Sequence, residues 1–276
     1  ASGSWRAAPR LELRASGYLR DLEQAEAQSG IAGGLGYRAL GGMLTAWTQW
    51  EPGWTLAAGA GVSGSDAPDA DPVGTARVAL GSPLRHPVKA TLSFARSAFD
   101  ATALLARNRV VSTEWALNAT ANPARGWTLT ANGSTAVYRG REENRQVAGS
   151  AAVTRLVSRL VTLGVAARAF GFEEDLTEGY FDPDFYGIVE ATAGWAREGR
   201  RWVLAAEAAP GWQQVGSEGE RTASFRATGR VGYVVGPGRQ VGVSGAYANS
   251  GLQQLAPTGG ADYRYRAVSV FSSWTF

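Results

Sequence analysis

Apolar and polar residues alternate along most of this chain. Between Arg10 and Arg20, apolar or small residues at the odd positions alternate with charged or polar residues at the even positions. The cleanest alternation runs from Trp127 to Ser134, where apolar residues alternate with threonine, asparagine and serine. A period of two residues is that of a β-strand with one apolar and one polar face. We count about fourteen such strands of roughly ten to fourteen residues, enough for a tilted crossing of a membrane, and about twelve or sixteen if Gly30–Trp50 divides differently.

The connections between these strands alternate in length. Compact turns such as Glu51–Gly53 and Asn122–Gly126 follow every second strand, and longer polar segments such as Ser63–Pro72 and Glu173–Phe185 follow the others. Short periplasmic turns and long extracellular loops are the rule in outer-membrane barrels, and an even strand count places both chain ends on the short-turn side. The pattern predicts an all-β fold, a single closed transmembrane antiparallel up-and-down β-barrel over residues 1–276, with 1–8 as a short periplasmic N-terminal segment. A soluble β-sandwich is the alternative, although it rarely shows so regular a meander.

The final ten residues form an alternating strand that stops on an aromatic residue. Val268, Val270, Trp274 and Phe276 share the face that we expect to point outward, with Phe276 in the aromatic girdle at a membrane surface. This ending resembles the C-terminal signal of bacterial outer-membrane β-barrel proteins, which the barrel-assembly machinery of that membrane reads. The resemblance implies an integral protein of the bacterial outer membrane, both termini periplasmic, with the lipid bilayer and that machinery as partners. An ordinary edge strand is the alternative.

Composition agrees with a barrel and excludes several other classes. The 276 residues include 36 glycines, 10 tryptophans, 9 tyrosines and 9 phenylalanines, a mixture that suits a barrel. The mean hydropathy of −0.16 does not argue against a membrane location, because only every second residue of a barrel strand faces lipid. The absence of cysteine excludes disulfide frameworks and cysteine metal sites. A scattered net charge of +3 gives no indication of nucleic-acid binding. The first residues show no basic and apolar leader, so we expect a mature or trimmed start.

We find no catalytic or metal-binding constellation in the sequence. Its one histidine, His86, lies between Pro83 and Pro87 in a predicted turn on the periplasmic side, far from the loop side where barrel enzymes carry their sites. Three loop aspartates lack the ligand set of a known calcium loop, so we expect that loop to be solvated: Asp66, Asp69 and Asp71. We therefore expect no enzyme activity, no cofactor and no metal.

The polar face of the strands defines a candidate lumen. Basic residues somewhat outnumber acidic ones among its members, which are Arg10, Glu12, Arg14, Arg77, Lys89, Glu114, Asn118, Asn132, Arg168, Glu190, Glu207, Arg226 and Arg230. Such a set can wet a pore, and a charged ring can tune selectivity toward anionic solutes. The alternative is that these charges pair across the wall and only fill the barrel.

The longest loop carries a more particular resemblance. Its segment Gly179–Tyr186 reads Gly-Tyr-Phe-Asp-Pro-Asp-Phe-Tyr and leads into a strand. It resembles the Gly-Tyr-Phe-Ser-Pro-x-x-Tyr-like segment in the C-terminal barrels of the cellulose synthase outer-membrane component and related exopolysaccharide exporters. The segment Tyr138–Arg145 is similar to a Tyr-x-Asp-Gly-Asn-x-Arg segment of such barrels, without its Asp-Gly pair. The resemblance implies passive polysaccharide export, usually with a periplasmic tetratricopeptide scaffold, a repeat that this sequence lacks. The scaffold would then belong to a longer chain or to a separate partner.

The same loop supplies the candidate substrate contacts. Aromatic rings at four positions can offer flat faces to sugars: Tyr180, Phe181, Phe185 and Tyr186. Asp182 and Asp184 can accept hydrogen bonds from sugar hydroxyls. Alternatively, the aromatic residues pack the loop and Pro183 stiffens its turn.

These patterns favour an outer-membrane channel without chemistry of its own, for exopolysaccharide export. The first alternative is a general or anion-preferring porin for small solutes, argued from the lumen charges alone. The second is a structural barrel that anchors another envelope protein or complex. The sequence does not distinguish an open from a plugged lumen.

Overall fold

A computed structural model describes residues 2–8, 10–24, 34–50, 53–68, 70–83, 88–100, 102–176, 179–236, 239–249 and 265–274. These ranges contain one short helix, α2 (Ala103–Arg107), and fifteen strands. The strands are β1 (Ser2–Ala8), β2 (Leu11–Gln24), β3 (Leu35–Trp50), β4 (Trp54–Ser65), β5 (Val73–Gly81), β6 (Val88–Ala98), β7 (Val111–Ala121), β8 (Trp127–Arg139), β9 (Glu143–Leu156), β10 (Val161–Phe172), β11 (Tyr186–Glu198), β12 (Trp202–Val215), β13 (Arg221–Gly236), β14 (Arg239–Ala248) and β15 (Tyr265–Trp274). None of the helical structure in these ranges has the length and apolar character of a membrane span.

The strands form one sheet whose order follows the sequence. Every strand from β1 to β15 pairs with the next along the chain, and the pairs are antiparallel. The predicted strands correspond to β2–β15, so the all-β, up-and-down prediction is confirmed. Part of the predicted N-terminal segment forms β1, which pairs with β2 over Ser2–Ala8.

The sheet separates an outer apolar face from an inner face, as the period-two pattern requires. Leu19, Val147 and Val270 expose 69%, 68% and 83% of their surface, and they belong to the set of outward apolar residues. Leu129 and Ala131, the centre of the cleanest alternation, are also exposed on that face. An unpartnered apolar face of this extent would be unfavourable in water, whereas a bilayer covers it. The burial pattern therefore fits a lipid-facing wall and contradicts a sandwich core.

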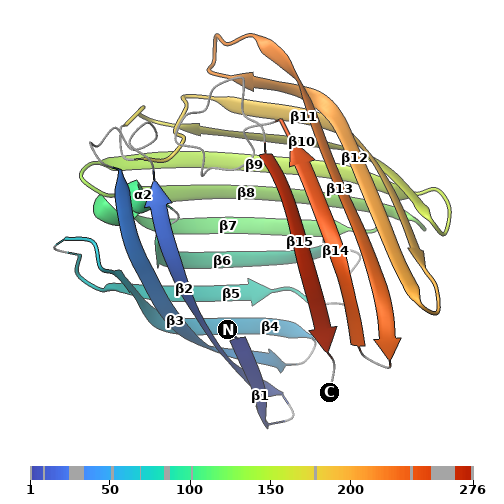
Figure 1. Cartoon of the computed structure of the whole chain (residues 1–276), viewed down its shortest axis with the longest axis horizontal. Helices are drawn as coiled ribbons and strands as arrows, with labels where there is room; N and C mark the ends of the chain where they lie inside the picture. Colours follow the sequence, from blue (N-terminus) through green and yellow to red (C-terminus); the bar gives the residue numbers. More distant parts are fainter. Residues whose placement is uncertain are drawn as a thin grey trace.

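Figure 1 shows the sheet curving round, so that β2 on the left and β13–β15 on the right run obliquely across the nearer face, in front of β5–β9. The first residues of β2 lie near the β3–β4 turn, since Leu11 pairs with Thr48. The last residues of β15 lie beside the β13–β14 turn, since Trp274 pairs with Arg239. The start of β2 and the end of β15 therefore lie at the short-turn end, whereas β1 begins beside Ser16, part-way along β2. Within the described ranges, no ladder joins β15 to β1 or β2.

Aromatic residues gather at the short-turn end of the outer face. Trp50 pairs with Trp54 across the β3–β4 turn, and the rings of Trp202 and Tyr233 lie 5.0 Å apart. The Arg155 guanidinium lies 5.2 Å from the ring of Trp127. Amphipathic rings of this kind favour the boundary between lipid and water. They mark the level of one membrane surface.

Candidate transport lumen

The first segment that packs against the inner face at the loop end of the sheet follows β6. Its helix α2 begins after Thr102, whose hydroxyl accepts a hydrogen bond from the Leu105 amide at 3.3 Å. Leu105 and Val110 are buried among aromatic residues of the inner face. Ala103 and Ala106 pack against side chains of β2 and β3. The helix thus lies on the inner side of the sheet.

Asp100 attaches this segment to β2. The Tyr18 hydroxyl donates a hydrogen bond to its carboxylate at 2.7 Å, and Arg20 forms an ion pair with it at 3.2 Å. Because Asp100 is buried, its charge needs these two partners. The start of the segment is therefore fixed to the inner face of the wall.

The second such segment is the loop between β10 and β11. Tyr180 stacks on Tyr138 and lies 6.2 Å from Phe99, ring centre to ring centre, so it joins the β6–β7 segment to the wall. Phe181 packs edge-on against Phe170 and Tyr186. We call the described residues of 99–110 and 173–185 together the plug. Its apolar residues pack against side chains of the inner face at the loop end of the sheet.

Polar contacts hold the second plug segment. Asp182, 5% exposed, accepts hydrogen bonds from the Leu176 amide at 2.7 Å and from the Asn144 side chain at 3.3 Å. Burial raises the pKa of Asp182 to about 6, a shift that these hydrogen bonds oppose and that the nearby Asp175 adds to. The Asn144 side chain also accepts a hydrogen bond from the Glu174 amide at 3.1 Å. These bonds fix the loop to the start of β9.

The two plug segments meet at Gly179. Its φ is +101°, and a Cβ atom there would lie 2.8 Å from the side chain of Leu104. Only glycine fits this backbone conformation and this close approach. The resemblance to the exporter segment singled out this glycine without indicating its contact.

The predicted substrate contacts fall into two groups. Tyr180, Phe181, Asp182 and Tyr186 are buried in the plug or beneath it. Asp184 is exposed and Phe185 half-buried. The Ser217 amide and hydroxyl donate to Asp184, which lowers the pKa of that carboxyl and ties the loop to the β12–β13 connection. In this conformation the buried rings pack the loop, and direct sugar contact stays a prediction.

The predicted lumen residues form several local groups. The central one surrounds Glu190, which is 1% exposed and lies 3.4 Å from Arg168 and 3.5 Å from Arg226. Arg226 also pairs with Glu207 at 2.7 Å. Arg14 pairs with Glu12 at 2.8 Å. The Asn132 amide donates to Asn118 at 2.6 Å across β7 and β8.

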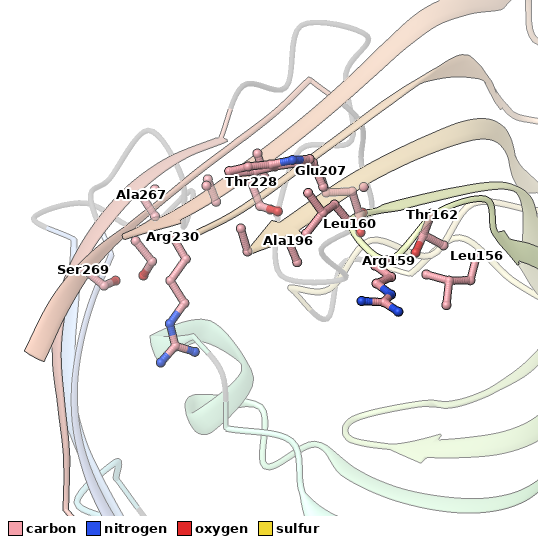
Figure 2. Close-up of a pocket in the computed structure, with 18 residues that line it drawn as sticks. Leu156, Arg159, Leu160, Thr162, Ala196, Glu207, Thr228, Arg230, Ala267 and Ser269 are labelled. Carbon is pink, nitrogen blue, oxygen red and sulfur yellow. The ribbon is translucent and has the colours of Figure 1, made fainter. Parts of the chain in front are cut away.

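A cavity of about 630 Å³ lies between β10–β15. Glu207, Arg230 and Arg159 line it together with hydroxyl groups of Thr162, Thr228, Ser244 and Ser269. Figure 2 shows the guanidinium groups of Arg159 and Arg230 extending from the wall into the open interior. The Arg230 guanidinium also lies 4.0 Å from the ring centre of Phe271. Charges and hydroxyls at one cavity suit a hydrated, polar solute.

A second cavity, of about 740 Å³, adjoins the plug. Its lining includes Tyr18, Arg20 and Asp100 beside Ser63 and Thr75. The alternation of apolar and polar residues did not indicate this group, because Asp100 lies outside the strands. Thr102 followed by Ala-Leu-Leu-Ala-Arg is a capped helix signal that could have located α2.

Several predicted residues lie outside the described residues or side chains. His86, Asp69 and Phe276 are outside the described ranges, and the Trp274 side chain is not described. Asp66 accepts a hydrogen bond from the Arg38 amide at 2.6 Å, and Asp71 is exposed. Among the described residues, no group of three or more potential ligands could hold a metal ion.

Comparison of the sequence with known protein families and with curated proteins gives no match. The fold is similar to a solved bacterial polysaccharide outer membrane secretin, with a TM-score of 0.68 at 10% identity over 98% of this chain and 87% of that one. It is also similar to CdiB from Escherichia coli, with a TM-score of 0.53 at 13% identity over 99% of this chain and 58% of that one. At such identities the likeness concerns the fold. The chain has the fold of bacterial outer-membrane β-barrels.

Proposed function

We propose that this chain is an integral outer-membrane barrel that exports a polysaccharide strand through its lumen, without chemistry of its own. The likeness over nearly the whole chain to a barrel named as a polysaccharide secretin supports the proposal. The lumen adds support, because hydroxyls and charged side chains line a cavity of about 630 Å³ on the short-turn side of the plug. All of the exporter-like segment except Tyr186, the first residue of β11, belongs to the plug.

In this proposal the plug is a gate. Its rings and its buried carboxylate close the loop end at rest, and the polymer passes when the two segments separate. The bilayer covers the outer wall, the assembly machinery inserts the barrel, and both termini face the periplasm. A periplasmic tetratricopeptide scaffold or another envelope protein would deliver the polymer.

Single-channel recording in planar lipid bilayers tests the proposal. The variant Gly179→Val strains a backbone at φ +101° and pushes a side chain into Leu104, so it separates the two plug segments. Gly133→Val is the matched control, because a Cβ there meets no atom within 4 Å. We expect a mostly silent wild type, steady openings for Gly179→Val, and reversible block of those openings by an oligosaccharide.

The two alternative functions, a porin and a structural anchor, predict different single-channel recordings. A steadily open wild type that oligosaccharides do not block would favour the small-solute porin. Silence of both the wild type and Gly179→Val would favour the structural anchor. Either record contradicts export through a gated lumen.

A further inference from the structure

The acidic side chains of the inner face are largely neutralised by specific arginines. Glu12 pairs with Arg14, and Asp100 pairs with Arg20. Glu190 pairs with Arg168 of β10 and Arg226 of β13, and Glu207 pairs with Arg226. These carboxylates are therefore not available to attract a cationic solute.

Several cations of the inner face have no such partner. Within the described part of the chain, no carboxylate lies within ion-pair distance of Lys89, Arg159 or Arg230. Arg77 also has no carboxylate within ion-pair distance in the described part of the chain. It pairs in register with Ala95 of β6, and Ala95 pairs with Glu114 of β7, so Glu114 lies two strands away on the same face and offsets part of the charge of Arg77. The uncompensated charge of the lumen is therefore positive.

The three clear cations lie toward the short-turn end of the barrel. Lys89 is near the start of β6, Arg159 is in the β9–β10 turn, and Arg230 is in the half of β13 that leads to the β13–β14 turn. This end is opposite the plug and faces the periplasm in the proposed orientation. A polymer that arrives from the periplasm meets these cations first.

Arg230 is the best placed of them for binding a ligand. Phe271 lies beneath its guanidinium at 4.0 Å, which limits the orientations available to it. Hydroxyls of Thr228 and Ser244 line the same cavity. A guanidinium forms paired hydrogen bonds with a carboxylate, and hydroxyls suit the remaining positions of a sugar ring. The cavity volume falls within the range of about 300–1,000 Å³ for small-molecule sites.

We propose that the periplasmic half of the lumen is a binding site for an acidic polysaccharide, one that carries carboxylate groups along its chain. This inference rests on the proposed export function and specifies its substrate class. Arg230 and Lys89 bind the carboxylates, and the cavity hydroxyls bind the uncharged part of the sugar. Electrostatic attraction also concentrates the polymer at this end of the barrel.

Oligosaccharide binding to the full chain in lipid nanodiscs tests the inference. The probes are a hexamer of galacturonic acid, the neutral maltohexaose and the cationic chitosan hexamer, each at low and at high salt. We expect the acidic hexamer to bind roughly tenfold more tightly than maltohexaose at low salt, with most of this advantage lost near 0.5 M, at a Debye length of about 4 Å. Arg230→Gln and Lys89→Gln should each weaken binding of the acidic hexamer several-fold and leave maltohexaose unchanged.

Arg155→Gln is the matched control, because Arg155 lies on the outer face against Trp127. It should change none of the affinities. Equal binding of all three probes, or tighter binding of chitosan hexamer, overturns the acidic substrate and leaves polysaccharide export standing. If no probe binds and none blocks the openings of Gly179→Val, export itself is contradicted as well.

Discussion

Tyr180 in the β10–β11 loop stacks on Tyr138 of β8, with ring centres 5.2 Å apart and 27° between the ring planes. Both rings are buried, and Phe172 lies close to each of them. This contact joins the plug to the wall of the barrel. The plug therefore depends on aromatic packing, which can break without loss of any strand ladder.

Tyr180→Ala should release the plug while the barrel stays folded. Loss of a large buried ring costs about 3 kcal/mol, which corresponds to an increase on the order of a hundredfold in local opening. Hydrogen exchange should accelerate by this order in residues 179–185 and much less in β8. Trp212→Ala, a substitution on the exposed outer face, is the control and should leave exchange in the plug unchanged. Equal acceleration throughout the sheet would show that Tyr180 stabilises the whole barrel instead.

Closure of the plug should depend on pH through Asp182. The pKa of this carboxyl is about 6 in the docked loop, above its ordinary value of 3.8, because burial disfavours the charged form. Between pH 3.8 and about 6, Asp182 is therefore protonated to a greater extent when the β10–β11 loop is packed in the plug than when this loop is released into solvent. The stability of the docked loop falls as pH rises through this window and levels off above about 6. The open probability in planar bilayers should be higher at pH 7.5 than at pH 4.5.

Asp182→Asn should remove this pH dependence, because its amide oxygen still accepts hydrogen bonds but does not titrate. Asp184→Asn is the control. Ser217 lowers the pKa of Asp184 below 3.8, so its titration lies outside the window. An unchanged pH profile in Asp182→Asn would exclude Asp182 as the titrating group.

Glu190 should contribute more to barrel stability than Glu207 does. Glu190 is 1% exposed between Arg168 and Arg226, whereas the Glu207 side chain is 42% exposed. Glu190→Gln removes the partner of Arg168 and one of the two carboxylates that pair with Arg226, so a loss of about 1–3 kcal/mol is expected, while an exposed pair contributes up to about 1 kcal/mol. Unfolding of Glu190→Gln and Glu207→Gln in urea, followed by tryptophan fluorescence, measures the difference. Similar losses for the two variants would mean that lumen water solvates Glu190 fully.

The strands were predictable because the polarity of each residue indicates which face of the sheet it occupies. Leu163 and Val165 are apolar and exposed on β10, and Arg168 on the opposite face meets Glu190. The plug was not predictable in this way, because Tyr180 meets Tyr138 across a long separation in sequence. Aromatic residues in a loop look the same whether they bind a ligand or pack against the barrel wall. The distinction depends on which distant ring lies nearby.

The lipid-facing wall can be tested with two neighbouring residues of β10. Val165 is exposed on the outer face, and Ala166 points to the lumen, in register with Glu190. An arginine on the lipid side near the middle of a bilayer costs about 2–4 kcal/mol, because its charge leaves water. An arginine on the lumen side keeps water and can reach a carboxylate. Val165→Arg should therefore lower the folded fraction in liposomes strongly, and Ala166→Arg should lower it little, as measured by the gel mobility of unheated samples. If both variants fold equally well, the outer face of β10 does not contact lipid, and the membrane barrel is contradicted at this strand.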